Sequence, residues 1–177
     1  MSELNSWVNV LNTQGQATVA NGILFSNESL GQIVDSLYIR FLGRNSDAGG
    51  RAAWINQLQQ GASLESVEAG FLTSPEYLGH IDTDFVQSLY INLLGRTGSA
   101  AELAGWNNNI QTLGLVGIAN GFLSSAEYRG DNVRVDYVSF LNRTPSATEV
   151  SNFANSPLGL LSIEAIILGS PECFANI

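Results

Sequence analysis

The stretch VEAGFLTSPEY, residues 67–77, decides the fold because it recurs along the whole chain. It returns as IANGFLSSAEY at 118–128, as VANGILFSNES at 19–29 and as IEAIILGSPEC at 163–173. The serines that close these copies are Ser26, Ser74, Ser125 and Ser170, which gives a period of roughly 50 residues. A period in that range is typical of repeated supersecondary units that pack on their neighbours.

A second string stands ahead of each complete copy. It reads LYIRFLGR at 37–44, LYINLLGR at 89–96 and DYVSFLNR at 136–143. An aromatic residue follows each arginine of this string by ten positions, and a tryptophan fills the same slot in the truncated first copy; these aromatics are Trp7, Trp54, Trp106 and Phe153. We therefore divide the chain into an N-terminal half-repeat (1–28), two helical repeats (29–80 and 81–130) and a degenerate C-terminal repeat (131–177).

The apolar positions of the first complete unit follow the period of an α-helix. Between residues 33 and 42 they recur at i, i+1, i+4, i+5, i+8 and i+9, which only a helix places on one face. Ser29 and Gln32 form a capping-box pattern just ahead of this run, so we expect the helix to begin there. The chain is predicted to be all-α, built of tandem multi-helix repeats that form a compact body or a short solenoid.

Helix ends recur in register as well. Gly43, Gly95 and Asn142 follow the first helix of each unit, and glycine and asparagine best tolerate the left-handed conformation that ends a helix. The next helix is predicted to begin after the N-caps Asp47, Ser99 and Ser146. A glycine also stands inside three of the four repeated helices, at Gly22, Gly70 and Gly121, which indicates close approach of a neighbouring helix.

Composition excludes several classes of partner. The 177 residues carry a net charge of −9, and all seven basic residues are arginine. Such an acidic surface repels phosphate backbones and anionic lipid headgroups, so we expect no nucleic acid partner. No apolar run reaches the length that spans a bilayer, so membrane insertion is not expected. The N-terminus has no basic residue ahead of its apolar positions and does not resemble a Sec signal peptide.

The repeated charges favour a structural role over a binding role. Arg44, Arg96 and Arg143 could form an anion-binding row, but each follows a helix C-terminus, where a cation is stabilised by free carbonyls. Acidic residues recur just as regularly, at Glu28, Glu76, Glu127 and Glu172. An arginine–glutamate pair between helices accounts for both sets, so we interpret these residues as inter-helix clamps.

Other candidate sites have a simpler structural interpretation. The aromatics Trp7, Trp54, Trp106 and Phe153 could stack on sugars, but their fixed slot favours the core. The string HIDTD at 80–84 offers metal ligands, yet Asp82 or Asp84 is equally an N-cap. Cys173 could act as a nucleophile only with His80, the single histidine, and it fills a tyrosine slot, so we expect a small buried side chain. No catalytic, cofactor or metal residues are therefore assigned.

The combination of LYxxLLGR, a capped turn, an aromatic residue and GFLxSxEY resembles a bacterial family, domain of unknown function 4214. The resemblance is specific at 37–77, good at 89–128 and partial elsewhere. It implies an all-helical module, distantly similar to the helical domains of phycobilisome linkers, that often accompanies secreted or surface-attached bacterial proteins. The family has no catalytic residues to transfer.

These observations predict a function of assembly. We expect a non-catalytic structural or protein–protein interaction module in a cell-surface, secreted or virion assembly, with no cofactor and no enzyme activity. The unmatched half-repeat suggests head-to-tail self-association as one form of partnership, and the exposed polar run 107–109 is a candidate contact. The alternative is a carbohydrate-binding adhesin module with a glycan partner. The sequence leaves the compartment undecided between an extracellular location, reached without a Sec signal, and a virion.

Overall fold

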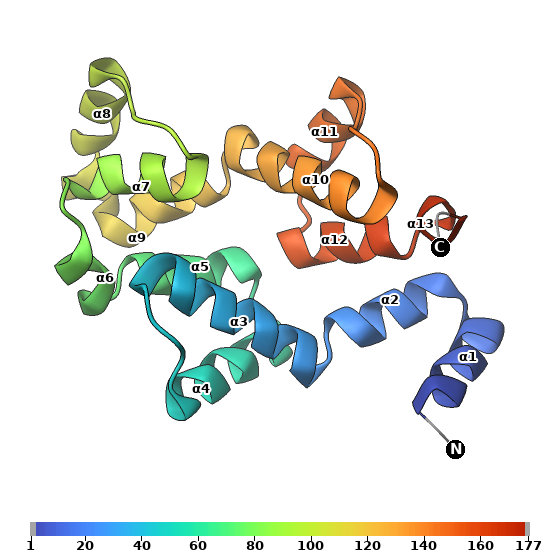
Figure 1. Cartoon of the computed structure of the whole chain (residues 1–177). Helices are drawn as coiled ribbons and strands as arrows, with labels where there is room; N and C mark the ends of the chain where they lie inside the picture. Colours follow the sequence, from blue (N-terminus) through green and yellow to red (C-terminus); the bar gives the residue numbers. More distant parts are fainter. Residues whose placement is uncertain (1–2, 176–177) are drawn as a thin grey trace.

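The computed structural model describes residues 3–175, and within them the chain folds into helices without strands (Figure 1). This confirms the predicted all-α repeat fold. The helices are α1 (Glu3–Gln14), α2 (Gln16–Leu24), α3 (Asn27–Leu42), α4 (Ala48–Gln59), α5 (Leu64–Leu72), α6 (Pro75–His80), α7 (Phe85–Leu94), α8 (Ala100–Asn107), α9 (Ile110–Leu123), α10 (Ala126–Leu141), α11 (Ala147–Ala154), α12 (Leu160–Leu168) and α13 (Pro171–Ala175).

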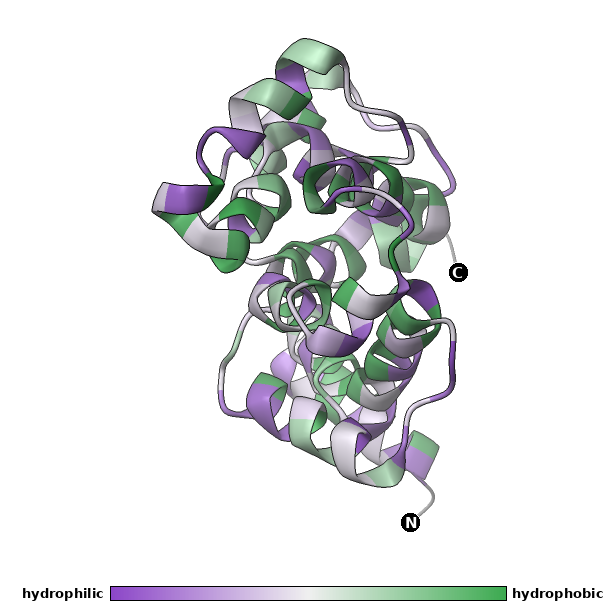
Figure 2. Ribbon diagram, turned by 90° about the vertical axis from the view of Figure 1, so that its left-hand side faces the viewer, coloured by the Kyte–Doolittle hydropathy of each residue, from purple (hydrophilic) through white to green (hydrophobic). Residues whose placement is uncertain are grey.

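Each complete unit places the same three helices in the same order. A first helix (α3, α7 or α10) is followed by a helix that carries the aromatic slot (α4, α8 or α11) and then by the repeated GFL helix (α5, α9 or α12). The N-terminal half-repeat supplies only the last two, as α1 and α2. Most helices combine hydrophobic and hydrophilic residues along their length (Figure 2), as amphipathic helices do.

The helix ends follow the local signals of the sequence. Gly43 and Gly95 have φ values of 64° and 63°, and Asn142 has a φ of 53°. Asp47 accepts a hydrogen bond from the Gly50 N–H, while Ser99 and Ser146 each form a capping box. The first unit begins earlier than the sequence indicates, because Ser26 rather than Ser29 caps α3.

Two of the expected boundaries, after residues 28 and 130, fall inside α3 and α10. In these places the short helix after the closing serine continues without a break into the first helix of the next unit. The segment from Ser74 to Arg96 is four residues longer than the matching segments of the other two joints. The extra residues interrupt the helix, so α6 and α7 are separate and Asp84 caps α7 anew.

The units close on themselves instead of extending as an open solenoid. Helix α5 packs against α9 in the middle of the chain, and α2 packs in the same way against α12, which joins the N-terminal half-repeat to the last unit. In Figure 1 the lower row of helices, α1 to α5, and the upper row, α8 to α12, run in opposite directions. An approximate two-fold relation therefore pairs α1 with α8, α2 with α9, α3 with α10, α5 with α12 and α6 with α13, and we call residues in matching slots counterparts.

The core lies where the GFL helices meet the first helices. Its fully buried side chains include Tyr77, Tyr128, Phe71 and Phe122. Phe71 contacts the edge of Tyr38, with ring centroids 4.9 Å apart, and Phe122 contacts Tyr90 in the same way at 4.8 Å. The first helix of a unit thus covers the aromatic residue of its own GFL helix.

Candidate interaction site

Three arginines join the first helix of each complete unit to the helix that follows the closing serine. Arg96 Nε donates to Glu127 at 2.6 Å, and Arg44 Nη2 donates to Glu76 at 2.9 Å. Arg143 makes the same pair with Glu172, where Nη2 lies 3.0 Å from Oε2. These partners raise the pKa of each arginine and lower the pKa of each glutamate.

Each of these guanidinium groups also lies over the ring of the tyrosine in its own first helix. The distances to the ring centroids are 4.8 Å for Tyr38, 4.7 Å for Tyr90 and 4.8 Å for Tyr137. In the second and third units the capping glutamate is a further partner, and its hydrogen bonds to the arginine lower the pKa of Glu102 and of Glu149 to about 2. The tyrosine rings and the glutamates therefore fix the position of each guanidinium group, and the glutamates neutralise its charge.

Glu28 is the one member of the expected clamps that the structure does not pair. It is exposed in the first turn of α3 and makes no ion pair within residues 3–175. The physical reason is the missing partner helix: the arginine of each clamp comes from a first helix, and no arginine precedes Arg40 in the chain.

The four aromatics of the repeated slot, which we expected to belong to the core, are half-buried. Trp54, Trp106 and Phe153 pack on the core from outside, and Trp54 stacks on Phe71 with centroids 5.0 Å apart. Part of each ring therefore remains in contact with solvent.

The mid-helix glycines make room for these rings and not for a helix backbone. A Cβ at Gly22, Gly70 or Gly121 would lie 2.6 Å from the Cη2 atom of the tryptophan in the same unit. In the last unit Ile166 replaces the glycine, and Phe153 replaces the tryptophan. Ring size and glycine therefore change together, which is what a steric contact requires.

A buried ion pair that the sequence analysis did not identify ties the units together. Arg129 is 7% exposed, and its Nη1 donates to Glu65 at 3.0 Å. Its other nitrogens donate to backbone carbonyls of the turn that follows α11, including Ala154 at 2.8 Å and Leu158 at 2.7 Å. Glu65 also accepts from the Leu160 N–H, so one ion pair positions the start of α12. The available signal was an arginine in a slot that holds Leu30 and Leu78 elsewhere.

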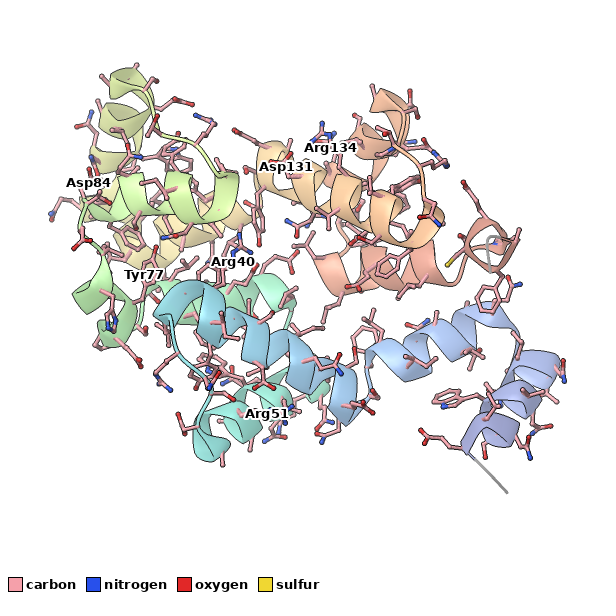
Figure 3. All side chains as sticks on the ribbon, in the orientation of Figure 1. Arg40, Arg51, Tyr77, Asp84, Asp131 and Arg134 are labelled. Carbon is pink, nitrogen blue, oxygen red and sulfur yellow. The ribbon has the colours of Figure 1, made fainter. Side chains whose placement is uncertain are left out.

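Glu68 is a second buried acid beside this pair. It is 2% exposed, it accepts a hydrogen bond of 2.6 Å from the Tyr128 hydroxyl, and Arg40 lies 3.7 Å away. Arg40 also donates to the Asn92 carbonyl at 2.7 Å and so bridges α3 to α7, the region where Figure 3 labels it. Burial raises the pKa of Glu68 to about 7 and raises the pKa of Tyr128.

Two residues of the HIDTD string, Asp84 and His80, have structural roles. Asp84 caps α7 by accepting from the Gln87 N–H at 2.9 Å, and His80 Nδ1 lies 2.8 Å from the Glu76 carbonyl oxygen. No cluster of three His, Cys, Asp or Glu side chains suited to a metal ion occurs in residues 3–175. Cys173 is buried in α13, at the opposite end of the molecule from His80 of α6 (Figure 1).

The half-repeat leaves apolar side chains uncovered. In the slot of Phe71, Phe122 and Ile167, which are 1%, 2% and 2% exposed, α2 carries Ile23, which is 50% exposed. Leu4 and Val8 of α1 are exposed as well. We call these three residues the open face. Leu4 and Ile23 are exposed because no first helix covers α1 and α2 within residues 3–175.

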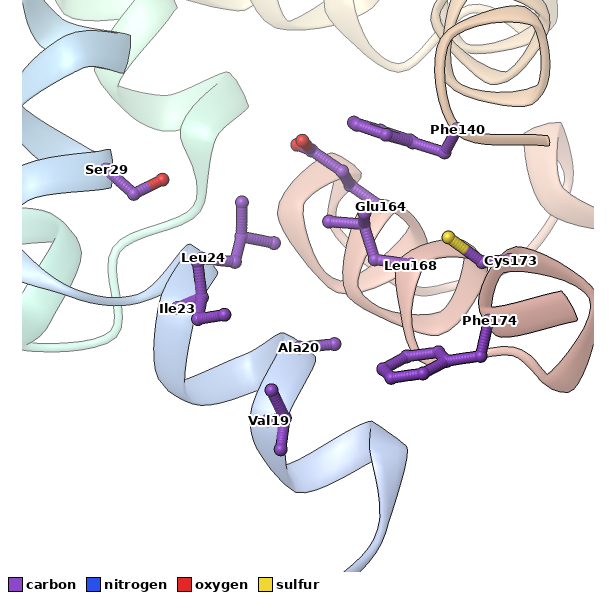
Figure 4. A pocket seen from close by; sticks show the side chains of 10 residues that line it. All are labelled: Val19, Ala20, Ile23, Leu24, Ser29, Phe140, Glu164, Leu168, Cys173 and Phe174. Carbon is purple, nitrogen blue, oxygen red and sulfur yellow. The ribbon is translucent and has the colours of Figure 1, made fainter. Parts of the chain in front are cut away.

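A cavity of about 380 Å³ adjoins the open face between α2 and the last unit. Ile23, Ser29, Phe140, Leu168 and Cys173 contribute to its lining (Figure 4), and Glu164 reaches into it as the acidic group. Burial raises the pKa of Glu164, and it raises the pKa of nearby Asp136 to about 7. The cavity is therefore apolar with one acidic edge.

Comparison with known proteins places the chain in a family. The model of a family described as Domain of unknown function (DUF4214) matches residues 27–81 and again residues 78–132. No curated protein and no solved structure matches the chain. No helix within the described residues is both long enough and apolar enough to cross a membrane.

Proposed function

The chain belongs to the DUF4214 family, and from this premise we propose that it is a non-catalytic structural module that binds another protein. The setting that we propose is an assembly at a cell surface, in a secreted complex or in a virion. The binding surface is the open face of α1 and α2.

The observation that supports this proposal is the contrast between charged side chains that are paired within the protein and apolar side chains that nothing covers. The arginines and glutamates that recur at matching slots of the repeats are engaged in structural pairs, as Arg96 is with Glu127. The open face, in contrast, exposes Leu4 by 71%, Val8 by 46% and Ile23 by 50%. Apolar side chains grouped in this way on a surface are typical of protein contacts.

We further propose that Arg44, Arg96 and Arg143 act as inter-helix clamps in this scaffold. Replacing Arg96 with alanine removes its ion pair with Glu127 and leaves Tyr90 without its cation, so the melting temperature is expected to fall. Circular dichroism measures it. An unchanged melting temperature would show that the pair contributes nothing to the fold.

Site-specific photo-cross-linking in cells that express the protein tests the interaction proposal. A photoreactive amino acid at position 23 is compared with the same group at position 39, where Ile39 of α3 is 59% exposed on another surface. We expect protein adducts at position 23 in several-fold higher yield than at position 39. Equal yields, or no protein adduct at either position, would contradict the proposal.

A carbohydrate-binding adhesin is the second candidate, and one observation favours it. Trp106 lines a shallow hollow of about 330 Å³ together with Tyr90, Glu102 and Asn109. An aromatic face beside amide and carboxylate groups suits a sugar ring. A glycan array reports binding, and Trp106→Phe is expected to reduce the signal while Trp54→Phe leaves it unchanged. A signal that both variants retain excludes this hollow.

A further inference from the structure

We propose that the open face and its cavity receive an amphipathic helix from a second polypeptide, in the position that α7 occupies on the other half of the molecule. The helix carries large apolar side chains on one face and an arginine just beyond its C-terminal end. This inference rests on the proposed function and names the partner that the same surface binds.

The two-fold relation defines where such a helix would lie. Helix α7 packs against α8, α9 and α10, and the counterparts of these three helices are α1, α2 and α3. Nothing within residues 3–175 takes the place of α7 beside them. The helices α1, α2 and α3 therefore form a three-sided binding site for a helix, which we call the seat. On the other side of the molecule α8, α9 and α10 form the same arrangement, and α7 occupies it.

The exposed side chains agree with this placement. Phe122 of α9 is covered by Tyr90 of α7 and is 2% exposed, whereas its counterpart Ile23 is 50% exposed. Leu103 of α8 is partly buried, whereas its counterpart Leu4 is 71% exposed. Each position loses its cover where the first helix is absent.

The cavity lies under the same seat and indicates which side chains the partner carries. On the filled side Tyr77 and Tyr128 are buried, and the Tyr77 hydroxyl bonds with Ser88 and Asn92 of α7. Their counterparts in the cavity are the shorter Cys173 and Ser29, which leave about 380 Å³ unfilled. A docking helix therefore needs bulky apolar residues, and it needs no polar partner for a tyrosine hydroxyl.

Charge defines the orientation of the helix. Arg96, two residues beyond the end of α7, pairs with Glu127 in the first turn of α10. The counterpart of Glu127 is Glu28, which is exposed and makes no ion pair within the described residues. A basic residue beyond the C-terminus of the partner helix completes this pair.

Fluorescence anisotropy with a labelled peptide tests the proposal. The peptide is DFVQSLYINLLGRT, residues 84–97 of this chain, which carries α7 and its arginine. We expect saturable binding to the whole protein. Ile23→Asp should weaken binding about tenfold or more, because it places a charge in the apolar contact, while the matched control Ile39→Asp leaves the affinity unchanged.

A double-mutant cycle tests the ion pair. Glu28→Gln in the protein and Arg→Gln in the peptide should each weaken binding about two- to fivefold, as expected for an exposed pair. The two changes together should weaken it no further than either alone. Additive losses would overturn the predicted orientation of the helix. Glu28 is exposed, so this variant keeps the measurement available if Ile23→Asp disturbs the fold.

Three outcomes overturn the inference. The first is that the peptide does not bind, or that it binds equally well to the Ile23→Asp protein. The second is self-association in analytical ultracentrifugation that Ile23→Asp abolishes without peptide binding, which assigns the seat to a second copy. The third is binding of dodecylamine, but not of the peptide, which assigns the cavity to small amphiphiles. Protein cross-links at position 23 without peptide binding would overturn this inference and leave the proposed function standing.

Discussion

The molecule has two similar ends, one around the contact of α5 with α9 and one around the contact of α2 with α12, and they differ in whether a first helix covers the contact. We call them the filled half and the open half. Where α5 meets α9, helix α7 covers the contact, and Tyr77 and Tyr128 are 1% exposed. Where α2 meets α12, the same slots hold Cys173 and Ser29, and a cavity remains. The comparison teaches that the repeat determines the backbone arrangement of both halves. The size of the side chains at matching slots differs with the presence or absence of a covering first helix.

The largest effect is expected from the buried ion pair, which only the filled half contains. The counterparts of Arg129 and Glu65 are the buried Leu30 and Leu161. Arg129→Leu leaves a carboxylate without its partner and should lower the free energy of unfolding by about 3–5 kcal/mol.

The double variant Arg129→Leu with Glu65→Leu copies the other half and should recover part of this loss, because no unpaired charge remains. Urea denaturation measures both variants. If the double variant is less stable than Arg129→Leu alone, the filled half does not tolerate the leucine pair that the open half has at these positions.

Glu68 should make stability depend on pH. Its pKa is raised from 4.5 to about 7 in the folded protein, so the folded state binds the proton more tightly than the unfolded state. The corresponding stabilisation is present below about pH 4.5 and is lost as the pH rises through about 7, by roughly 3 kcal/mol.

Glu68→Gln removes this titration and should flatten the change in unfolding free energy between pH 5 and pH 8. Its counterpart Glu164 lies at the cavity and is less buried, so Glu164→Gln should change the profile less. Denaturation curves at the two pH values check the prediction. If both variants changed the pH dependence of the unfolding free energy equally, the two acids would not differ in the way that their burial predicts.

The pairing of glycine with tryptophan should have an intermediate effect. Gly121→Ile forces a side chain against Trp106 and should lower the free energy of unfolding by about 1–3 kcal/mol. Adding Trp106→Phe recreates the combination that the last unit uses, Ile166 with Phe153, and should restore part of the stability. Thermal unfolding of the single and double variants measures the coupling, and strictly additive losses would show that the two positions are independent.

The smallest effect is a gain from filling the open half. Ser29→Tyr introduces the residue of the filled half into the cavity that Ser29 and Glu164 both line (Figure 4). We expect its hydroxyl to donate to Glu164, as Tyr128 donates to Glu68. Cavity filling of this kind should raise the free energy of unfolding by about 0.5–1 kcal/mol. It should also weaken binding of the residue 84–97 peptide. A variant that is stabilised and still binds the peptide equally well would separate the cavity from the seat.

The sequence predicts the features that depend on neighbours along the chain. Helix period, the left-handed ends at Gly43 and Asn142, and the N-caps are local, and internal repetition shows each of them several times. The repeated arginine and glutamate slots also indicate their mutual pairing.

Contacts between distant residues that occur only once escaped prediction. Arg129 and Glu65 are 64 positions apart, and no other unit repeats the pair. The partial exposure of Trp7 and Trp54 was missed for a related reason, since a repeated slot shows that a residue is structural but not which of its edges faces solvent. The closure of α2 on α12 depends on how the units turn around one another, which no local pattern encodes.

That closure also changes how the molecule comes apart. In an open array of repeats, the end units have one neighbour each and fray first, so denaturation spreads inward from the tips. Here α2 and α12 hold each other, and neither extremity of the ring can peel away without breaking a contact that the other needs. Heating should therefore melt the helices from α2 to α12 in a single concerted step.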